Sequence, residues 1–280
     1  MNENREKGIQ KALAGVEEEH DVTILYACES GSRAWGFESA DSDYDVRFIY
    51  VHQTPWYLTI APERDVIEQP VSDQLDLSGW DLPKALELFR RSNPPLLEWI
   101  QSPIVYRSKS GLISELRRLL PRYYSPISCM HHYLHMAAGN LREYLKGDEV
   151  WTKKYFYVLR PVLACLWIEQ GRGVVPTEFQ KLVDAVVTDP MLRREIDTLL
   201  ATKKQGDELR KGPRNEIISS FVEQQVSRMN ASEQANPETK DKRLLNRLFL
   251  QTLLEVNGRS IEPGLPGYRE PAAGLSQPEG

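Results

Sequence analysis

Two short motifs near the N-terminus combine residue types that suit chemistry on a phosphate group. Gly31 and Ser32 form the first motif, and Asp43 and Asp45 form the second. Glycine permits a tight turn with positive φ and lets backbone N–H groups approach an anion closely. Ser32 adds a hydroxyl donor beside those N–H groups, so the first motif predicts a cradle for phosphates.

The second motif predicts a metal site. Residues two apart on a strand share one face, so we expect the Asp43 and Asp45 carboxylates to lie side by side. Their repulsion is costly unless a cation lies between them, and Mg²⁺ prefers oxygen ligands of this kind. Two such ions hold the attacking and leaving oxygens in a displacement at phosphorus, with both aspartates as ligands.

Three predicted elements position these motifs. Residues 22–27 form a short apolar run that predicts a buried strand leading into the Gly-Ser turn. Residues 32–36 are expected to open a short helix, and residues 46–51 to form the strand that follows the acidic pair.

This arrangement resembles the minimal nucleotidyltransferases of the DNA polymerase β superfamily, whose pattern is Gly-Ser, a short helix and Asp-x-Asp on the next strand. Within the superfamily it is most similar to bacterial and phage nucleotidyltransferases associated with RNA ligase and RNA repair. The resemblance extends over residues 20–185 and includes segments 75–82, 92–99, 102–106 and 155–161. It implies two Mg²⁺ ions, a nucleoside triphosphate bound through Gly31 and Ser32, and transfer of its nucleoside monophosphate with release of pyrophosphate.

The resemblance also implies a third metal-binding carboxylate on a neighbouring strand. Asp76 lies in the alternating segment 74–78 and is the best candidate, with a further role in drawing the proton from the acceptor hydroxyl. Asp73 and Asp81 are the alternatives. Asp81 is better explained as a helix N-cap, because residues 82–89 follow with helical spacing and an early proline.

Phosphate binding also requires cations. Arg47 shares the strand face of the aspartates by parity, so it is expected to pair with them or with a triphosphate. The other predicted nucleotide-binding side chains are Arg33, Lys154 and Arg160, with Lys84 and Lys153 as further candidates. Aromatic residues around Lys154 favour helix packing over contact with a base; they are Tyr155, Phe156, Tyr157 and Trp167.

Other clusters indicate less. His131 and His135 have the spacing of a zinc pair, but the helix that holds them is better explained by core packing. The three cysteines, Cys28, Cys129 and Cys165, show no paired spacing, which suits free thiols in the cytoplasm. No apolar run is long enough to cross a membrane, so we expect no membrane partner.

The order of elements predicts an α+β protein. We expect a small mixed β-sheet with helices on one face in residues 1–107, and an all-helical domain in residues 108–256. Breaks are expected at Pro121, Pro126 and Pro190, among others. Residues 257–280 have the composition of a disordered tail.

Charge argues against non-specific coating of nucleic acid, because the chain has a net charge of −5 and a pI of 5.7. Basic runs are more consistent with solvated helix faces than with contacts to an RNA end; they include Arg117-Arg118, Lys203-Lys204, Arg210-Lys211 and Arg214. Together these observations predict a cytoplasmic, Mg²⁺-dependent nucleotidyltransferase that uses ATP. An RNA end is the first acceptor and a protein or small molecule the next. The alternative is a catalytically silent nucleotide-binding regulator or antitoxin-like partner.

Overall fold

The computed structural model describes residues 3–39, 41–61, 63–70, 74–206, 211–231 and 239–258. Its five-stranded sheet has the order β3-β4-β2-β1-β5. Strand β2 runs parallel to β4, and the other neighbouring strands pair antiparallel, so the sheet is mixed. The strands are β1 (Val22–Glu29), β2 (Tyr44–His52), β3 (Val66–Glu68), β4 (Leu75–Asp81) and β5 (Val105–Ser108). This sheet confirms the predicted α+β class.

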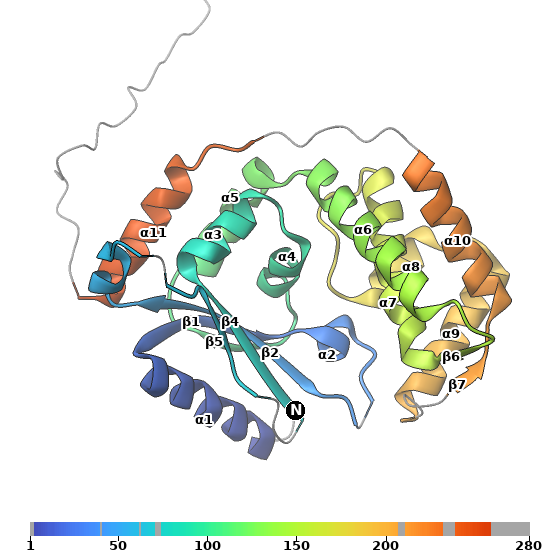
Figure 1. Cartoon of the computed structure of the whole chain (residues 1–280), viewed down its shortest axis with the longest axis horizontal. Coiled ribbons are helices and arrows are strands. Elements are labelled where there is room, and N and C mark those ends of the chain that lie inside the picture. Colours follow the sequence, from blue (N-terminus) through green and yellow to red (C-terminus); the bar gives the residue numbers. More distant parts are fainter. Residues whose placement is uncertain are drawn as a thin grey trace, which may run out of the picture.

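Helices cover both faces of the sheet (Figure 1). Helix α1 (Glu3–His20) buries Ile9 and Leu13 against one face. On the other face lie α3 (Leu82–Arg90), α4 (Pro94–Ile100) and α5 (Leu112–Tyr123). The expectation of helices on one face was therefore incomplete. Strongly charged residues dominate α1, but its few apolar side chains recur at helical spacing and form one buried stripe.

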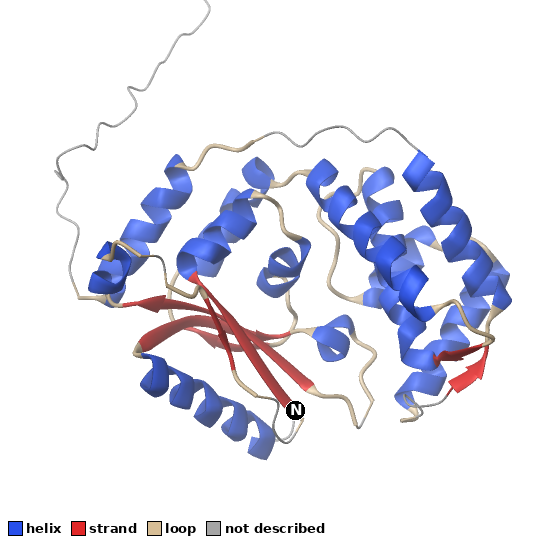
Figure 2. Cartoon of the chain, in the orientation of Figure 1, coloured by secondary structure: helices blue, strands red, loops and turns tan. Residues whose placement is uncertain are grey.

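Most of the second half of the chain is a bundle of helices (Figure 2). Its members are α6 (Pro126–Tyr144), α7 (Thr152–Glu169), α8 (Phe179–Val186), α9 (Pro190–Lys204) and α10 (Glu216–Ala231). The prediction that this half is all-helical needs one correction. Strands β6 (Glu149–Trp151) and β7 (Lys211–Pro213) pair antiparallel at one end of the bundle.

Two further details differ from expectation. Pro121 lies inside α5 and does not end it, because the helix continues to Tyr123 and Tyr124 donates its N–H to the carbonyl of Leu120. Helix α11 (Arg243–Val256) packs against α3 beside the sheet, on the opposite side of the molecule from α10 (Figure 1). Pro126 and Pro190 occupy the first turns of α6 and α9, as the breaks predicted.

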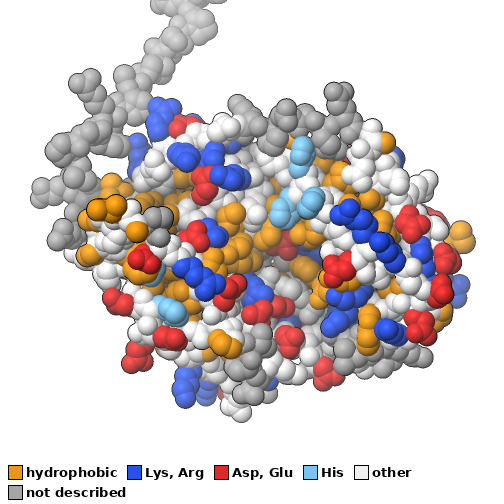
Figure 3. Space-filling model, viewed as in Figure 1, with side chains coloured by type: hydrophobic (Ala, Val, Ile, Leu, Met, Phe, Trp, Pro, Cys, Tyr) orange, Lys and Arg blue, Asp and Glu red, His pale blue; other side chains and the backbone are white. Residues whose placement is uncertain are grey.

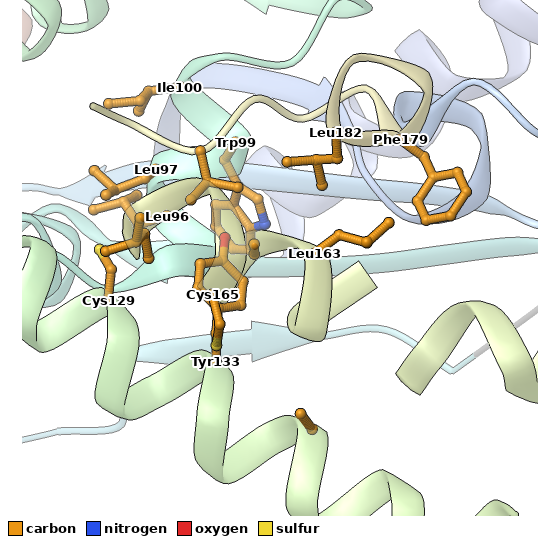
Figure 4. Packing of buried hydrophobic residues seen from close by; sticks show 14 of the residues in the cluster. Leu96, Leu97, Trp99, Ile100, Cys129, Tyr133, Leu163, Cys165, Phe179 and Leu182 are labelled. Atoms are coloured by element: carbon orange, nitrogen blue, oxygen red, sulfur yellow. The ribbon is translucent and has the colours of Figure 1, made fainter. Parts of the chain in front are cut away.

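One hydrophobic core joins the sheet to the bundle (Figure 4). Leu96 and Trp99 of α4 contribute to it together with Cys129 and Tyr133 of α6 and Leu163 of α7. The three cysteines are buried and free, as expected. No helix in the described ranges is long and apolar enough to span a membrane.

Candidate active site

A tight turn carries the Gly-Ser motif from β1 into helix α2 (Gly31–Trp35). Gly31 has a φ of +56°, and Gly36 ends the helix with a φ of +85°, so both glycines take the left-handed conformation. The Ser30 N–H donates to the carbonyl of Asp45 over 2.8 Å, which fixes the turn against β2. A Cβ atom on Gly31 would lie 1.9 Å from Oδ2 of Asp45, so no larger residue fits here.

Asp45 and Asp76 are direct neighbours in the sheet. Because β2 and β4 are parallel, Asp45 on β2 lies in register with Asp76 on β4. Arg47 Nη2 lies 3.0 Å from Oδ1 of Asp45 and 2.8 Å from Oδ2 of Asp76. The pairing that strand parity predicted for Arg47 is thus present. The two carboxylates converge on one cationic group, and the neighbouring strand does carry the candidate third acid.

Asp43 precedes β2, and its side chain is exposed. Its segment is held by Arg33, which donates from Nη2 to the Ser42 carbonyl over 2.7 Å and from Nε to the Asp43 carbonyl over 3.1 Å. The Arg33 guanidinium also lies 3.8 Å from the centre of the Tyr44 ring. Arg33, which was predicted to contact the nucleotide, thus holds the Asp43 segment in place.

A buried carboxyl group supports Asp45 from behind and was not predicted. Glu29 is fully buried at the end of β1, and its Oε1 accepts from the Asp45 N–H over 2.7 Å. The Tyr106 hydroxyl donates to Oε2 of Glu29. Burial raises the pKa of Glu29 to about 7, and burial also raises the pKa of Asp45. The hydrogen bond from the Asp45 N–H to Glu29 fixes the backbone at Asp45. In the sequence, the only indication of this role was an acidic residue at the end of a predicted buried strand.

A pocket of about 280 Å³ lies between the sheet and the bundle. From the sheet side it is lined by Ser30, Gly31, Ser32, Trp35, Phe37, Ser42, Asp43, Asp45 and Arg47. From the bundle side it is lined by Lys153 and Tyr157 of α7 and Lys203 of α9. The pocket thus places acidic side chains, a Gly-Ser turn and two lysines around one space, with aromatic rings at its wall.

Some of the basic side chains line the pocket, and others form contacts elsewhere in the fold. Lys153 lines the pocket, and so does Lys203, which the sequence placed on a solvated helix face in preference to an RNA contact. Lys203 is only 3% exposed, so the solvated-face interpretation is wrong for this residue. Three other side chains predicted to contact the nucleotide, Arg33, Lys154 and Arg160, do not line this pocket. Lys154 lies over the Tyr144 ring outside it, with Nζ 3.6 Å from the ring centre. Lys84 forms an ion pair with Asp65 over 2.8 Å.

Arg160 is part of a buried polar cluster around Glu98. Arg160 is 3% exposed, and its Nη1 lies 2.6 Å from Oε1 of Glu98. Glu98 also accepts from Tyr133 Oη over 3.0 Å and from Trp35 Nε1 over 3.1 Å. These donors come from α7, α6 and α2, so the cluster fixes the Gly-Ser helix against the bundle. The members of this cluster are far apart in the sequence, so their contacts could not be predicted from local patterns.

The remaining predicted residues have structural roles or lie outside the described ranges. Asp81 is the N-cap of α3, as predicted, and accepts from the Leu82 N–H over 2.7 Å. Asp73 and Arg210 lie outside the described residues, as do residues 259–280 of the predicted tail. Of the four aromatic residues noted around Lys154 in the sequence, only Tyr157 lines the pocket. Tyr155 and Phe156 are buried in the core.

Within the described ranges, no three His, Cys, Asp or Glu side chains are arranged to hold a metal ion. The zinc interpretation of His131 and His135 therefore has no support in this part of the chain. The Arg47 guanidinium lies between Asp45 and Asp76.

The mixed sheet, the Gly-Ser turn and the carboxylates on adjacent strands are the features of a polymerase β-type nucleotidyltransferase fold. The chain belongs to the RlaP family, described as the RNA repair pathway DNA polymerase beta family, which matches residues 6–251. This finding confirms the resemblance seen in the sequence. Nucleotidyltransferases of this type generally use divalent metal ions.

Two individual proteins are also similar to this chain. The uncharacterized protein YcgL of Bacillus subtilis (strain 168) is 49% identical over 246 residues, which cover 87% of this chain and 95% of YcgL. Among solved structures, a nucleotidyltransferase-like protein from Exiguobacterium sibiricum 255-15 aligns with a TM-score of 0.32 and 12% identity. That alignment covers 90% of this chain and 81% of the other.

Proposed function

We propose that this protein is a Mg²⁺-dependent nucleotidyltransferase that moves a nucleoside monophosphate from a nucleoside triphosphate to an acceptor hydroxyl and releases pyrophosphate. One observation carries the proposal. Asp45 and Asp76, from adjacent strands, converge on a single cationic group beside the Gly31-Ser32 turn. Folding alone does not require two acids at adjacent register positions, since like charges there are destabilising.

We infer a magnesium site from the donor chemistry of three acidic residues. Asp43, Asp45 and Asp76 supply only carboxylate oxygens, the donors that this hard ion prefers. The position of the Arg47 guanidinium between Asp45 and Asp76 supports a cation at this point. When bound, magnesium would neutralise phosphate charge and favour the ionised form of the acceptor hydroxyl.

The chain's own residues account for binding and proton transfer. Gly31 and Ser32 line the pocket and would bind the β- and γ-phosphates, with Lys153 and Lys203 balancing their charge. Asp76 would accept the acceptor's hydroxyl proton. The acceptor oxygen then bonds to the α-phosphorus, the bond from that phosphorus to the bridging oxygen breaks, and pyrophosphate leaves.

The family and the pocket guide the choice of substrates to test. ATP is the first triphosphate to test, and Tyr157, at the pocket wall, would contact its base. An RNA end is the first acceptor because the family is described as an RNA repair family. A protein hydroxyl and a small molecule such as an aminoglycoside come next. The buried free thiols of all three cysteines support the predicted cytoplasmic location.

Incorporation of label tests the proposal. Purified protein is incubated with Mg²⁺ and each nucleoside triphosphate radiolabelled at the α-phosphate, with and without cellular RNA. Label is then followed into RNA, protein and small molecules. We expect label in one fraction with wild-type protein and none with the double variant Asp43→Asn/Asp45→Asn, which should fold normally because it loses two repelling charges.

The outcomes distinguish two functions. Full incorporation by the double variant would show that these carboxylates do not hold the catalytic metal. Nucleotide binding by calorimetry without incorporation into any fraction would favour the alternative of a catalytically silent nucleotide-binding regulator.

A further inference from the structure

A row of aromatic rings leads from the pocket to the surface of the bundle. Phe37 and Trp35 line the pocket with ring centres 5.7 Å apart, and Trp35 lies 6.5 Å from Tyr157. Tyr157 is 38% exposed at the pocket edge and lies 6.2 Å from Tyr144, which is outside the pocket. The row thus runs from the nucleotide site to Tyr144, which is half-buried at the end of α6.

Lysines accompany the outer rings. Lys154 Nζ lies 3.6 Å from the centre of the Tyr144 ring and 5.3 Å from that of Tyr157. Trp151, the N-cap residue of α7, is 37% exposed, and Lys211 Nζ lies 5.1 Å from its ring centre. The C-terminal end of α6, strand β6 and strand β7 lie at the same end of the bundle (Figure 1).

Exposed aromatic rings paired with lysines are typical of surfaces that bind single-stranded nucleic acid. Each base presents a face that stacks on an aromatic ring, and lysines neutralise the phosphates between the bases. A duplex offers no such faces, because its bases are already stacked. The net charge of the chain is −5, and basic and acidic side chains are interspersed on the face seen in Figure 3. Attraction of RNA therefore depends on a local set of residues.

We propose that the surface formed by Tyr144, Trp151, Lys154 and Lys211 binds a single-stranded RNA segment, whose free end enters the adjacent pocket as the acceptor. The inference rests on the proposed function and assigns a binding surface to its RNA acceptor. It also gives Lys154 a role, since this lysine lies outside the nucleotide pocket yet beside Tyr157.

RNA binding and nucleotide binding are measured separately on the full chain. Fluorescence anisotropy reports binding of an end-labelled single strand of about ten nucleotides, and of the same strand in a duplex. Calorimetry reports binding of ATP with Mg²⁺, and circular dichroism reports folding. The test variants are Tyr144→Leu, Tyr144→Phe and Lys154→Gln.

Matched controls come from the other end of α7. There the Arg172 guanidinium lies 5.6 Å from the centre of the Trp167 ring, a similar pairing of a cation with an aromatic ring. Residues 154 and 167 are about 20 Å apart along a helix. Trp167→Leu and Arg172→Gln therefore also remove an aromatic ring and a positive charge, but far from the proposed surface.

We expect wild-type protein to bind the single strand more tightly than the duplex. Tyr144→Leu should weaken single-strand binding about 5- to 150-fold, whereas Tyr144→Phe, which keeps the ring, should restore it. Lys154→Gln should reduce the slope of log affinity against log salt concentration by about 0.7. The two controls should bind RNA like wild type, and ATP binding should be unchanged in all variants.

Equal binding of single strand and duplex would overturn the inference, as would equal RNA affinity of folded Tyr144→Leu and Trp167→Leu. Loss of ATP binding in Tyr144→Leu would also overturn it by placing the row within the nucleotide site. The expected RNA results without ATP binding in the wild-type protein would support the RNA surface and refute the proposed function.

Discussion

Gly31 approaches Asp45 so closely that a Cβ atom at position 31 would lie 1.9 Å from the Asp45 carboxylate oxygen Oδ2. The contact links the two motifs directly, because the turn that would bind phosphates touches the acid that would bind metal. Any side chain at position 31 must displace either the turn or the Asp45 carboxylate.

Gly31→Ala should therefore lower nucleotidyl transfer by about a hundredfold or more, because it moves Asp45 as well as straining the turn. Gly36→Ala is the matched control. Gly36 also has positive φ, at +85°, but a Cβ there would meet nothing within 4 Å. We expect the control to lose about 1 kcal/mol of stability from backbone strain and to keep its activity. Equal loss of activity in both variants, measured by label transfer, would show that turn strain alone matters.

Arg47 should compete with magnesium for the same two carboxylates. Removing it in Arg47→Ala leaves Asp45 and Asp76 facing each other without a cation, so the variant should unfold at a lower temperature in the presence of a chelator. Magnesium should then raise the melting temperature more in the variant than in wild type, because it restores the missing charge.

Arg107→Ala provides the comparison for this prediction. Arg107 pairs with Glu17 over 2.7 Å on the edge strand β5, and its side chain is 13% exposed, similar to 18% for Arg47 on the central strand β2. Thermal unfolding of this variant should not respond to magnesium more than wild type does. A smaller magnesium effect in Arg47→Ala than in wild type would contradict a cation site at Asp45 and Asp76.

Substitution of Arg160 should lower stability, whereas substitution of Lys153 should weaken ATP binding. Arg160→Gln leaves Glu98 buried without its ion pair, so it should lower the free energy of unfolding by about 3 kcal/mol. Lys153→Gln should leave stability nearly unchanged and weaken ATP binding about tenfold, because it removes a charged partner from the pocket. Urea unfolding and calorimetry give the two quantities. If the Arg160→Gln variant is as stable as wild type but binds ATP weakly, Arg160 contacts the nucleotide and is not a structural support.

Asp81 should make stability depend on pH. Burial raises its pKa from 3.8 to about 6, although the hydrogen bond from Tyr57 opposes the shift. The folded state therefore holds a proton that the unfolded state has released, and this contribution to stability is lost as the pH rises from about 4 through 6. Asp81→Asn keeps the capping oxygen and removes the titration, so its stability relative to wild type should rise by up to about 3 kcal/mol over this range.

Urea unfolding between about pH 4 and pH 8 measures this difference, which cancels the titration of other groups. Asp65→Asn is the control, because that exposed carboxylate lies nearby and pairs with Lys84 at the surface. A constant difference between Asp81→Asn and wild type across the range would show that Asp81 is charged throughout.

Local sequence predicted the elements that depend on local chemistry. The apolar run before Gly31, the helix that Gly36 ends and the cap at Asp81 each depend on residues within a few positions. Strand parity likewise placed Arg47 with Asp45, because alternation is fixed within one strand. These features were predicted correctly from their own residues.

Tertiary structure decided which of these residues meet. The parallel register of β2 and β4 puts Asp76 beside Asp45, and a shift of one residue would turn Asp76 to the other face. Glu29 reaches Asp45 across paired strands, and Lys203 reaches the pocket from a helix that begins at Pro190.

Arg160 shows how a residue type alone can suggest a binding role when the side chain forms a buried ion pair. Its residue type suits a phosphate, but its partner Glu98 lies 62 residues away, in a part of the core that no local pattern reveals. The sequence by itself determined the chemical groups and the local elements that hold them, because propensity and periodicity act over short distances. The fold decided which charged groups became ligands and which became buried supports, because packing joins residues that are distant along the chain.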